Sequence, residues 1–379
     1  MRVTERTMTA CTGPQTVLST RQKKQARTAT GYMVHPNRRA AAVIFAAAML
    51  ITACGSGREY TDQADALIEN GEYAKALETL DVAENSGEDM RLVHRSRGIA
   101  DMGLSDYEAA ETEFVQSLSS NKGYVREMDL DTSYYLAISQ YRLGKVKDAN
   151  ATYSAILALY PKESDAYYLR GRTYLALQDN DNAKSDFDKA IRISPDDPDL
   201  YIQIYEALSE AGLSDDGQRY LKNAMELNTK LSYFQKGRLY YCMEEYDKAK
   251  QSLEAAVTEG GDSQASLYLG RTYEALGDMN YAASLYREYL ETDPGNAQVL
   301  NQLGLCLMNL EDYPAALDAF SKGLETGDPA MDQSLRFNQV AAYEYMGDFT
   351  KARNLMEDYM EKYPDDQEAQ RENEFLSTR

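Results

Sequence analysis

Few side chains in this sequence have types and spacings that could do chemistry, and three arginines are the most informative of them. Arg172, Arg238 and Arg271 each stand four residues after an aromatic or apolar side chain, so each pair would share one face of a helix. A guanidinium group can hold a carboxylate through two hydrogen bonds, and a neighbouring ring adds contact area at little entropic cost. This chemistry is recognition of a binding partner.

Groups suited to catalysis are scarce. After the amino-terminal segment the chain has a single histidine, His94. It has no serine-centred elbow, no HExxH pair and no glycine-rich phosphate loop. The acidic pairs Asp196-Asp197 and Asp215-Asp216 fall at expected turns, where we interpret them as helix caps or solvated loops. We therefore expect no catalytic residue, no metal site, no cofactor and no enzymatic activity.

From Arg58 onward the sequence repeats itself with a period near 34 residues. A small residue recurs at Ala76, Ala110, Ala149, Ala183, Gly217, Ala249, Ala282, Ala316 and Ala352. The steps between these positions are 34, 39, 34, 34, 32, 33, 34 and 36 residues. Prolines are few, and the alternation of Val, Ile and Thr that marks strands is missing, so the period predicts stacked helical hairpins.

Three further columns keep the same period. Twelve residues before the small residues stand Ala64, Gly98, Ala137, Gly171, Tyr205, Gly237, Gly270, Gly304 and Val340. Four residues after them stand Leu80, Phe114, Tyr153, Phe187, Leu221, Leu253, Tyr286, Phe320 and Met356, and prolines follow by twelve at 161, 195, 294 and 364. We interpret the small residues as points of close helix approach, and the large ones as filling the space between neighbouring hairpins.

This pattern resembles the tetratricopeptide repeat family, and the fourth repeat matches it best through Tyr167, Gly171, Tyr174, Ala183, Phe187, Ala190 and Pro195. The resemblance implies an all-α fold, a right-handed superhelical solenoid of about nine helix-turn-helix hairpins over residues 58–364. Residues 365–379 would form a capping helix or tail. Insertions near residues 119–123 and 326–331 depart from the period, and we expect longer loops or bends there.

In this family the first helix of each repeat lines a concave face, where extended or helical peptides bind. Carried onto this sequence, the resemblance places there the side chains of Tyr134, Tyr141, Tyr168, Arg172, Phe234, Arg238, Tyr241 and Arg271. Two interpretations of this row stay open. It is a groove that binds a peptide, or it is ordinary packing in which acids on the next helix neutralise each arginine.

The chain is strongly acidic. Its formal net charge is -21, and residues 54–379 alone hold 32 basic and 60 acidic side chains. Such a charge repels the phosphates of nucleic acids and the head groups of anionic lipids. We therefore expect no nucleic-acid partner, and any membrane attachment must have a source other than charge.

The amino-terminal segment has the pattern of an export signal. A basic patch precedes an apolar run over residues 40–53, which is too short to span a membrane as a helix. The run ends in Ile51-Thr52-Ala53-Cys54, which resembles the lipobox of bacterial lipoproteins, with Ile51 where leucine is commonest. The resemblance implies cleavage before Cys54 and two acyl chains on that residue, which would anchor the protein stably to a membrane.

These features divide the chain into segments. We expect residues 1–32 to be a disordered leader or an overextended reading frame, with the true start at Met33. Residues 33–53 would be the signal peptide, and residues 54–57 the tether that carries the lipid. The protein would then be exported and anchored at the outer face of the bacterial cell membrane, or in the periplasm or outer membrane of a diderm cell.

The expected function is that of a membrane-tethered scaffold that binds a protein or peptide partner outside the cytoplasmic membrane. By resemblance, tetratricopeptide lipoproteins serve in envelope, pilus, wall or secretion assembly. Two alternatives stay open. One is a structural array that associates with copies of itself, and the other is a non-catalytic subunit of an envelope enzyme complex.

Overall fold

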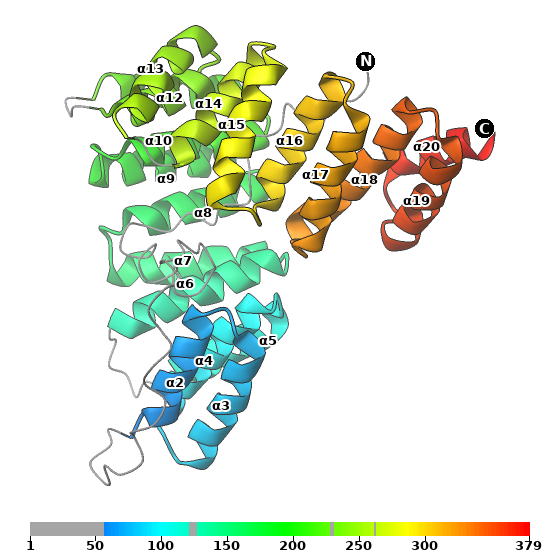
Figure 1. The fold of residues 1–379 in the computed structure, drawn as a ribbon. Helices are drawn as coiled ribbons and strands as arrows, with labels where there is room; N and C mark the ends of the chain where they lie inside the picture. Colours follow the sequence, from blue (N-terminus) through cyan, green and yellow to red (C-terminus); the bar gives the residue numbers. More distant parts are fainter. Residues whose placement is uncertain (1–56, 121–126, 228–230, 261–262) are drawn as a thin grey trace. The chain divides into compact units, whose positions relative to one another are not determined.

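A computed structural model gives the fold, and it describes residues 57–379 except 121–126, 228–230 and 261–262. Every regular element in these described residues is an α-helix (Figure 1). In chain order the helices are α2 (Glu59–Glu69), α3 (Tyr73–Asn85), α4 (Met90–Gly103), α5 (Tyr107–Ser119), α6 (Glu127–Arg142), α7 (Val146–Leu159), α8 (Ser164–Ala176), α9 (Asn180–Ile193), α10 (Pro198–Glu210), α11 (Ser214–Met225), α12 (Tyr233–Cys242), α13 (Tyr246–Thr258), α14 (Ser263–Ala275), α15 (Met279–Thr292), α16 (Ala297–Asn309), α17 (Tyr313–Glu325), α18 (Pro329–Tyr345), α19 (Phe349–Lys362) and α20 (Gln367–Ser377).

Cys54 and the expected leader and signal peptide lie outside the described residues. Among the helices that are described, none is both long and apolar enough to cross a membrane.

The chain divides into two compact units, whose described parts are residues 57–214 and 215–379. In the first unit α2–α3, α4–α5, α6–α7 and α8–α9 form hairpins, and α10 follows them. In the second unit α12–α13, α14–α15, α16–α17 and α18–α19 form hairpins, with α11 before them and α20 after them. With α10 and α11 as successive helices, the chain order contains the nine helix pairs that the period predicts, and the expected all-α repeat fold is confirmed.

The alanine column of the repeat marks the tightest part of each hairpin. All eight alanines of the column are fully buried, from Ala76 to Ala352, and Gly217 is buried as well. The glycines of the partner helix are equally constrained. A methyl group added at Gly98, Gly171 or Gly304 would overlap a phenylalanine ring of the same hairpin.

The large residues four positions after the alanines make two kinds of contact. Their side chains lie on the glycine of their own hairpin, as Phe114 does on Gly98 and Phe187 on Gly171. They also pack between neighbouring hairpins, as we expected, since Phe114 stacks on Tyr135 of α6 with 5.7 Å between ring centroids. A glycine leaves a hollow on the first helix, and the large side chain of the facing helix fills it.

The hairpin turns follow one plan. In the described turns between the two helices of a pair, one residue has a positive φ angle. In five turns this residue is glycine, at positions 71, 144, 212, 277 and 347. In the other four it is Ser105, Gln178, Glu244 or Glu311. An aspartate then caps many of the second helices. Asp278 and Asp312, for example, each accept a hydrogen bond from the backbone N–H three residues on.

The insertion near residues 326–331 lengthens a helix where we expected a longer loop or bend. Asp328 caps α18, Pro329 opens it, and the helix runs for 17 residues. Proline is favoured in the first turn because its missing N–H would have no partner there. The insertion near residues 119–123 falls partly on residues outside the described part of the chain.

Candidate partner-binding face

The first helices of neighbouring hairpins lie side by side within each unit. Contacts join α2 to α4, α4 to α6 and α8 to α10 in the first unit, and α12 to α14 and α16 to α18 in the second. Side chains that project from these helices therefore form a row in each unit. Of the eight predicted groove residues, four lie in the first unit and four in the second.

In the second unit, the predicted side chains converge on the ring of Tyr268 in α14. The rings of Phe234 and Tyr241 meet it edge to face, each with centroids 5.9 Å apart. The guanidinium carbons of Arg238 and Arg271 each lie 5.3 Å from its centroid. All five side chains, which we name the Tyr268 cluster, are half-buried, so they pack together and still face solvent.

In the first unit, Arg172 of α8 is the centre of a smaller group. Its guanidinium carbon lies 6.0 Å from the ring centroid of Tyr141, and its Nη2 lies 3.6 Å from a carboxylate oxygen of Glu210 in α10. Tyr134 and Tyr168 are only 2% and 3% exposed, so their rings support this row from inside the hairpins. Burial raises the pKa of the Tyr168 phenol well above its ordinary value.

These contacts bear differently on the two interpretations of the arginine row. Glu210 lies on the first helix of the following repeat, and its ion pair with Arg172 is the kind of neutralisation that the packing interpretation expects. Arg238 and Arg271 lie against the ring of Tyr268, and the charge of Arg271 also acts on the Glu274 carboxyl group. The second unit therefore presents a mixed aromatic and cationic surface.

The row continues along α14, α16 and α18 with polar side chains. Glu274 accepts a hydrogen bond from the Tyr286 hydroxyl at 2.9 Å and a longer one from Gln302 at 3.5 Å. Burial raises the pKa of Glu274, although the Tyr286 hydrogen bond and Arg271 oppose the shift. Between α18 and α16, the side-chain amide of Asn338 donates a hydrogen bond to the side-chain oxygen of Asn301 at 2.8 Å.

Sequence reasoning missed Tyr268, although a signal for it exists. Tyr268 stands 14 residues before Ala282, and Tyr135 holds the same place before Ala149. Tyr135 also has a guanidinium group beside it, since Arg95 lies 5.8 Å from its ring centroid. Alignment of this column across the repeats would therefore have identified both tyrosines.

The structure gives His94 a packing environment. Its Nδ1 lies 2.7 Å from a carboxylate oxygen of Glu113 in the second helix of the same hairpin, and both side chains are largely buried. Over the described ranges, His, Cys, Asp and Glu side chains form no group of three that could hold a metal ion.

Helical hairpins repeated about every 34 residues, with side chains presented along their first helices, define a helical-repeat binding protein. Models of the tetratricopeptide repeat match residues 134–198, 234–297, 281–331 and 335–366, which together make about half of the chain. The chain therefore contains tetratricopeptide repeats, as the sequence resemblance implies, and repeats of this kind form scaffolds for protein–protein interaction.

Curated relatives match this chain over parts of their length. The anaphase-promoting complex subunit CDC16 of Saccharomyces cerevisiae is 25% identical over 205 residues, 51% of this chain and 24% of the relative. Tetratricopeptide repeat protein 13 of Homo sapiens is 27% identical over 186 residues, 46% and 22% of the two chains. The BBSome complex member BBS4 of Bos taurus is 29% identical over 93 residues, 24% and 18%. The matched regions thus span a quarter or less of these relatives.

Solved structures show a distant likeness. A tetratricopeptide repeat protein from Parabacteroides merdae has a TM-score of 0.46 at 18% identity, covering 66% of this chain and 99% of its own. A human IFIT1 dimer has a TM-score of 0.45 at 15% identity, covering 86% and 87% of the two chains. Similarity at this level bears on neither the partner nor the activity of this chain.

Proposed function

We propose that this protein is a scaffold that binds a protein or peptide partner through the first-helix rows and is held at a membrane by lipid on Cys54. The Tyr268 cluster carries the binding part of the proposal. It offers three half-buried rings and two guanidinium groups on one surface of the second unit. Aromatic and arginine side chains of this kind supply most of the energy at protein interfaces.

The chemistry of the cluster favours an acidic or aromatic segment of the partner. Guanidinium groups already oriented by a ring lose little freedom when a carboxylate binds them.

The membrane part of the proposal is supported by the residue pattern that ends at Cys54. A lipid on this residue would hold the first hairpin close to the bilayer, because only three residues separate it from Arg58. Such a protein would work in envelope, pilus, wall or secretion assembly. The names of two relatives, a complex subunit and a complex member, support work within a protein complex.

The binding proposal is tested by crosslinked purification from membranes of the native cell. The Arg172→Ala/Arg238→Ala/Arg271→Ala variant should lose one specific exported partner while its circular dichroism stays that of the wild type. A matched variant, Arg192→Ala/Arg287→Ala, removes exposed arginines of second helices and should keep the partner. Capture of the same partner by all three proteins would rule out the arginine row as the binding surface.

The anchor is tested separately by growing cells with an alkyne-labelled fatty acid. The wild type should carry the label and sediment with membranes, whereas Cys54→Ser should do neither. Label that persists in Cys54→Ser would show that the lipid, if any, is attached elsewhere.

A further inference from the structure

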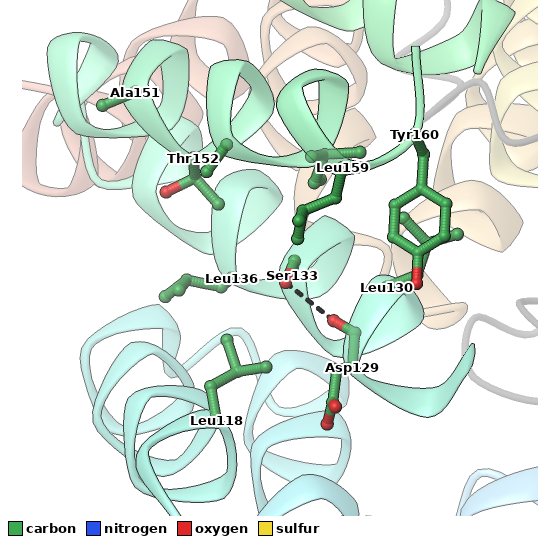
Figure 2. A pocket seen from close by; sticks show the side chains of 11 residues that line it. Leu118, Asp129, Leu130, Ser133, Leu136, Ala151, Thr152, Leu159 and Tyr160 are labelled. Carbon is green, nitrogen blue, oxygen red and sulfur yellow. Dashed lines mark hydrogen bonds between the residues drawn. The ribbon is translucent and has the colours of Figure 1, made fainter. Parts of the chain in front are cut away.

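The third hairpin, α6–α7, has a pocket of about 470 Å³ that the first-helix rows do not use. In Figure 2, α7 crosses one side of the pocket with Ala151 and Leu159, while Ser133 and Leu136 of α6 line the middle. Leu118 of α5 closes the opposite side. A volume of this size lies in the range of ligand-binding pockets.

The next hairpin explains why this space is open, because it carries a filled version of the same site 34 residues further on. Arg170 of α8 binds Asp186 of α9 through two hydrogen bonds of 2.6 and 3.0 Å, and Lys189 binds the same carboxylate at 3.0 Å. The ring of Tyr167 covers this network, with the Lys189 ammonium 5.3 Å and the Arg170 guanidinium carbon 5.6 Å from its centroid.

In the third hairpin all four of these positions hold smaller or apolar residues. Ser133, Leu136, Thr152 and Ala155 stand where the fourth hairpin has tyrosine, arginine, aspartate and lysine. All four line the pocket. The pocket is therefore the volume that the tyrosine and lysine occupy in the neighbouring repeat.

Three of the four polar side chains in the wall have partners within the protein, and the fourth is Tyr160. The Ser133 hydroxyl donates to the backbone carbonyl of Asp129 at 2.7 Å, and the Thr152 hydroxyl donates to Gln140 at 2.8 Å. The Asp129 carboxylate is paired with Arg91. An occupant of the pocket therefore gains little from polar atoms, and the site favours an apolar one.

An apolar stripe leads along α7 into the pocket. Ala151, Ala155 and Leu159 stand four residues apart and are exposed, and Leu159 keeps 60% of its surface in solvent. The equivalent stripes of other second helices are more polar: Ser185, Lys189 and Ile193 in α9, Ser284, Glu288 and Thr292 in α15, and Asp318 and Lys322 in α17 followed by Thr326 just after its end. An exposed apolar patch that other copies of the same repeat avoid is a mark of an interaction surface.

We propose that the third-hairpin pocket docks the apolar face of an amphipathic helix from a protein partner. A stripe with a residue every four positions follows a helix axis, and small alanines let a second helix approach closely. The pocket has room for more than one side chain, which fits successive turns of one helix. The net charge of -21 favours a helix whose polar face is basic. This surface shares no residue with the Tyr268 cluster.

The test uses a variant whose new side chains this scaffold already accommodates. Ser133→Tyr/Ala155→Lys places the tyrosine and lysine of the fourth hairpin in the third. The probe is a fluorescein-labelled synthetic peptide with leucine at every third or fourth position and lysine between, titrated by fluorescence anisotropy at physiological salt. A scrambled peptide of the same composition reports attraction by charge alone.

The wild type should bind the peptide saturably and the scrambled peptide at least tenfold more weakly. The Ser133→Tyr/Ala155→Lys protein, which we call the filled variant, should bind the peptide about tenfold or more weakly than the wild type. The Leu159→Ser variant should show a similar loss, and it alters only an exposed side chain. The matched control is Ala255→Lys, the same substitution at the equivalent position of α13, and it should bind as the wild type does.

Equal binding of the peptide by the wild type and both pocket variants would overturn the proposal. Two other results would assign a different occupant and also overturn it. In one, the wild type binds dodecanoate saturably but does not bind the peptide, and the filled variant has lost the binding of dodecanoate. The other is self-association of the wild type in sedimentation that the filled variant lacks. Peptide binding should be unchanged in Arg172→Ala/Arg238→Ala/Arg271→Ala, so this test and that of the proposed function fail independently.

Discussion

A glycine and a large side chain sixteen residues later make the central contact of five hairpins. The pairs are Gly98 with Phe114, Gly171 with Phe187, Gly237 with Leu253, Gly270 with Tyr286 and Gly304 with Phe320. The large side chain occupies the place where a β-carbon of the glycine would lie. Substitution of such a glycine therefore forces two helices apart or a ring out of its rotamer.

We predict that Gly304→Ala lowers the free energy of unfolding by about 1–3 kcal/mol, because its methyl group would overlap the Phe320 ring. Urea denaturation followed by circular dichroism measures the change. Gly295→Ala is the control, since an added methyl group there meets nothing within 4 Å and the backbone is not left-handed. A loss at Gly295 as large as at Gly304 would show that helix packing is not the cause.

At the scale of elements, the turn inside each hairpin requires a left-handed residue. Four described turns supply it without glycine, and Glu311 between α16 and α17 has a φ of 61°. A side chain in this region costs about 1–2 kcal/mol relative to glycine. These turns are thus strained positions that the other hairpins avoid.

We predict that Glu311→Gly raises the free energy of unfolding by about 1 kcal/mol, because it removes this cost. The reciprocal change, Gly277→Ala, should lower it by a similar amount, since Gly277 has a φ of 85°. Thermal and urea denaturation of both variants measure whether the free energy of unfolding rises or falls in each. A destabilised Glu311→Gly would mean that its side-chain contacts outweigh the backbone strain.

The last helix, α20, packs on the final hairpin through a small apolar contact and two carboxyl groups. Ala369 and Leu376 are fully buried, in a cluster with Met356 of α19. Nearby, burial and the facing carboxylate of Glu372 in α20 raise the pKa of Glu344 in α18 to about 7. When both carboxyl groups are charged, they repel each other across the contact between α18 and α20.

We predict that the wild type loses stability as the pH rises from about 4.5 to about 7, and that Glu344→Gln flattens this part of the profile. The folded state binds the proton of Glu344 more tightly than the unfolded chain, whose pKa is 4.5. The stability that protonated Glu344 contributes is therefore fully present below pH 4.5, and it is lost as the pH rises through the pKa of Glu344 in the folded protein. Urea denaturation across this pH range measures it, and identical slopes in both proteins would contradict the assignment.

At the scale of the whole molecule, charge is the dominant feature. A net charge of -21 on 379 residues means that folding brings many carboxylates near one another. Ion pairs such as Arg170 with Asp186 offset this repulsion locally, but the acidic excess cannot be paired.

We predict that sodium chloride raises the thermal midpoint when its concentration increases from low to physiological ionic strength. Salt at about 0.1 M shortens the range of charge repulsion to about 10 Å. Sucrose, which stabilises without screening, is the control for general solvent effects. A midpoint that falls with salt would show that ion pairs contribute more than the net repulsion costs.

The sequence alone determined the repeat, the number of helix pairs and the buried alanine column. Each of these follows from a spacing of small and large residues that recurs in all the repeats. It also predicted that Phe234, Arg238 and Arg271 lie on the same face of the first helices of their repeats. It did not identify Tyr268 as their common centre, or the ring-on-glycine contact as internal to each hairpin.

Only the tertiary structure decided which positions of neighbouring helices meet. Ser133 and Ala155 are small residues that do not stand out in the sequence, and they line an open pocket because they are too small to fill the place that Tyr167 and Lys189 occupy one repeat later. The physical reason is that period and polarity fix which face a side chain occupies. Whether that face is filled or empty depends on the volumes of side chains brought together from several helices.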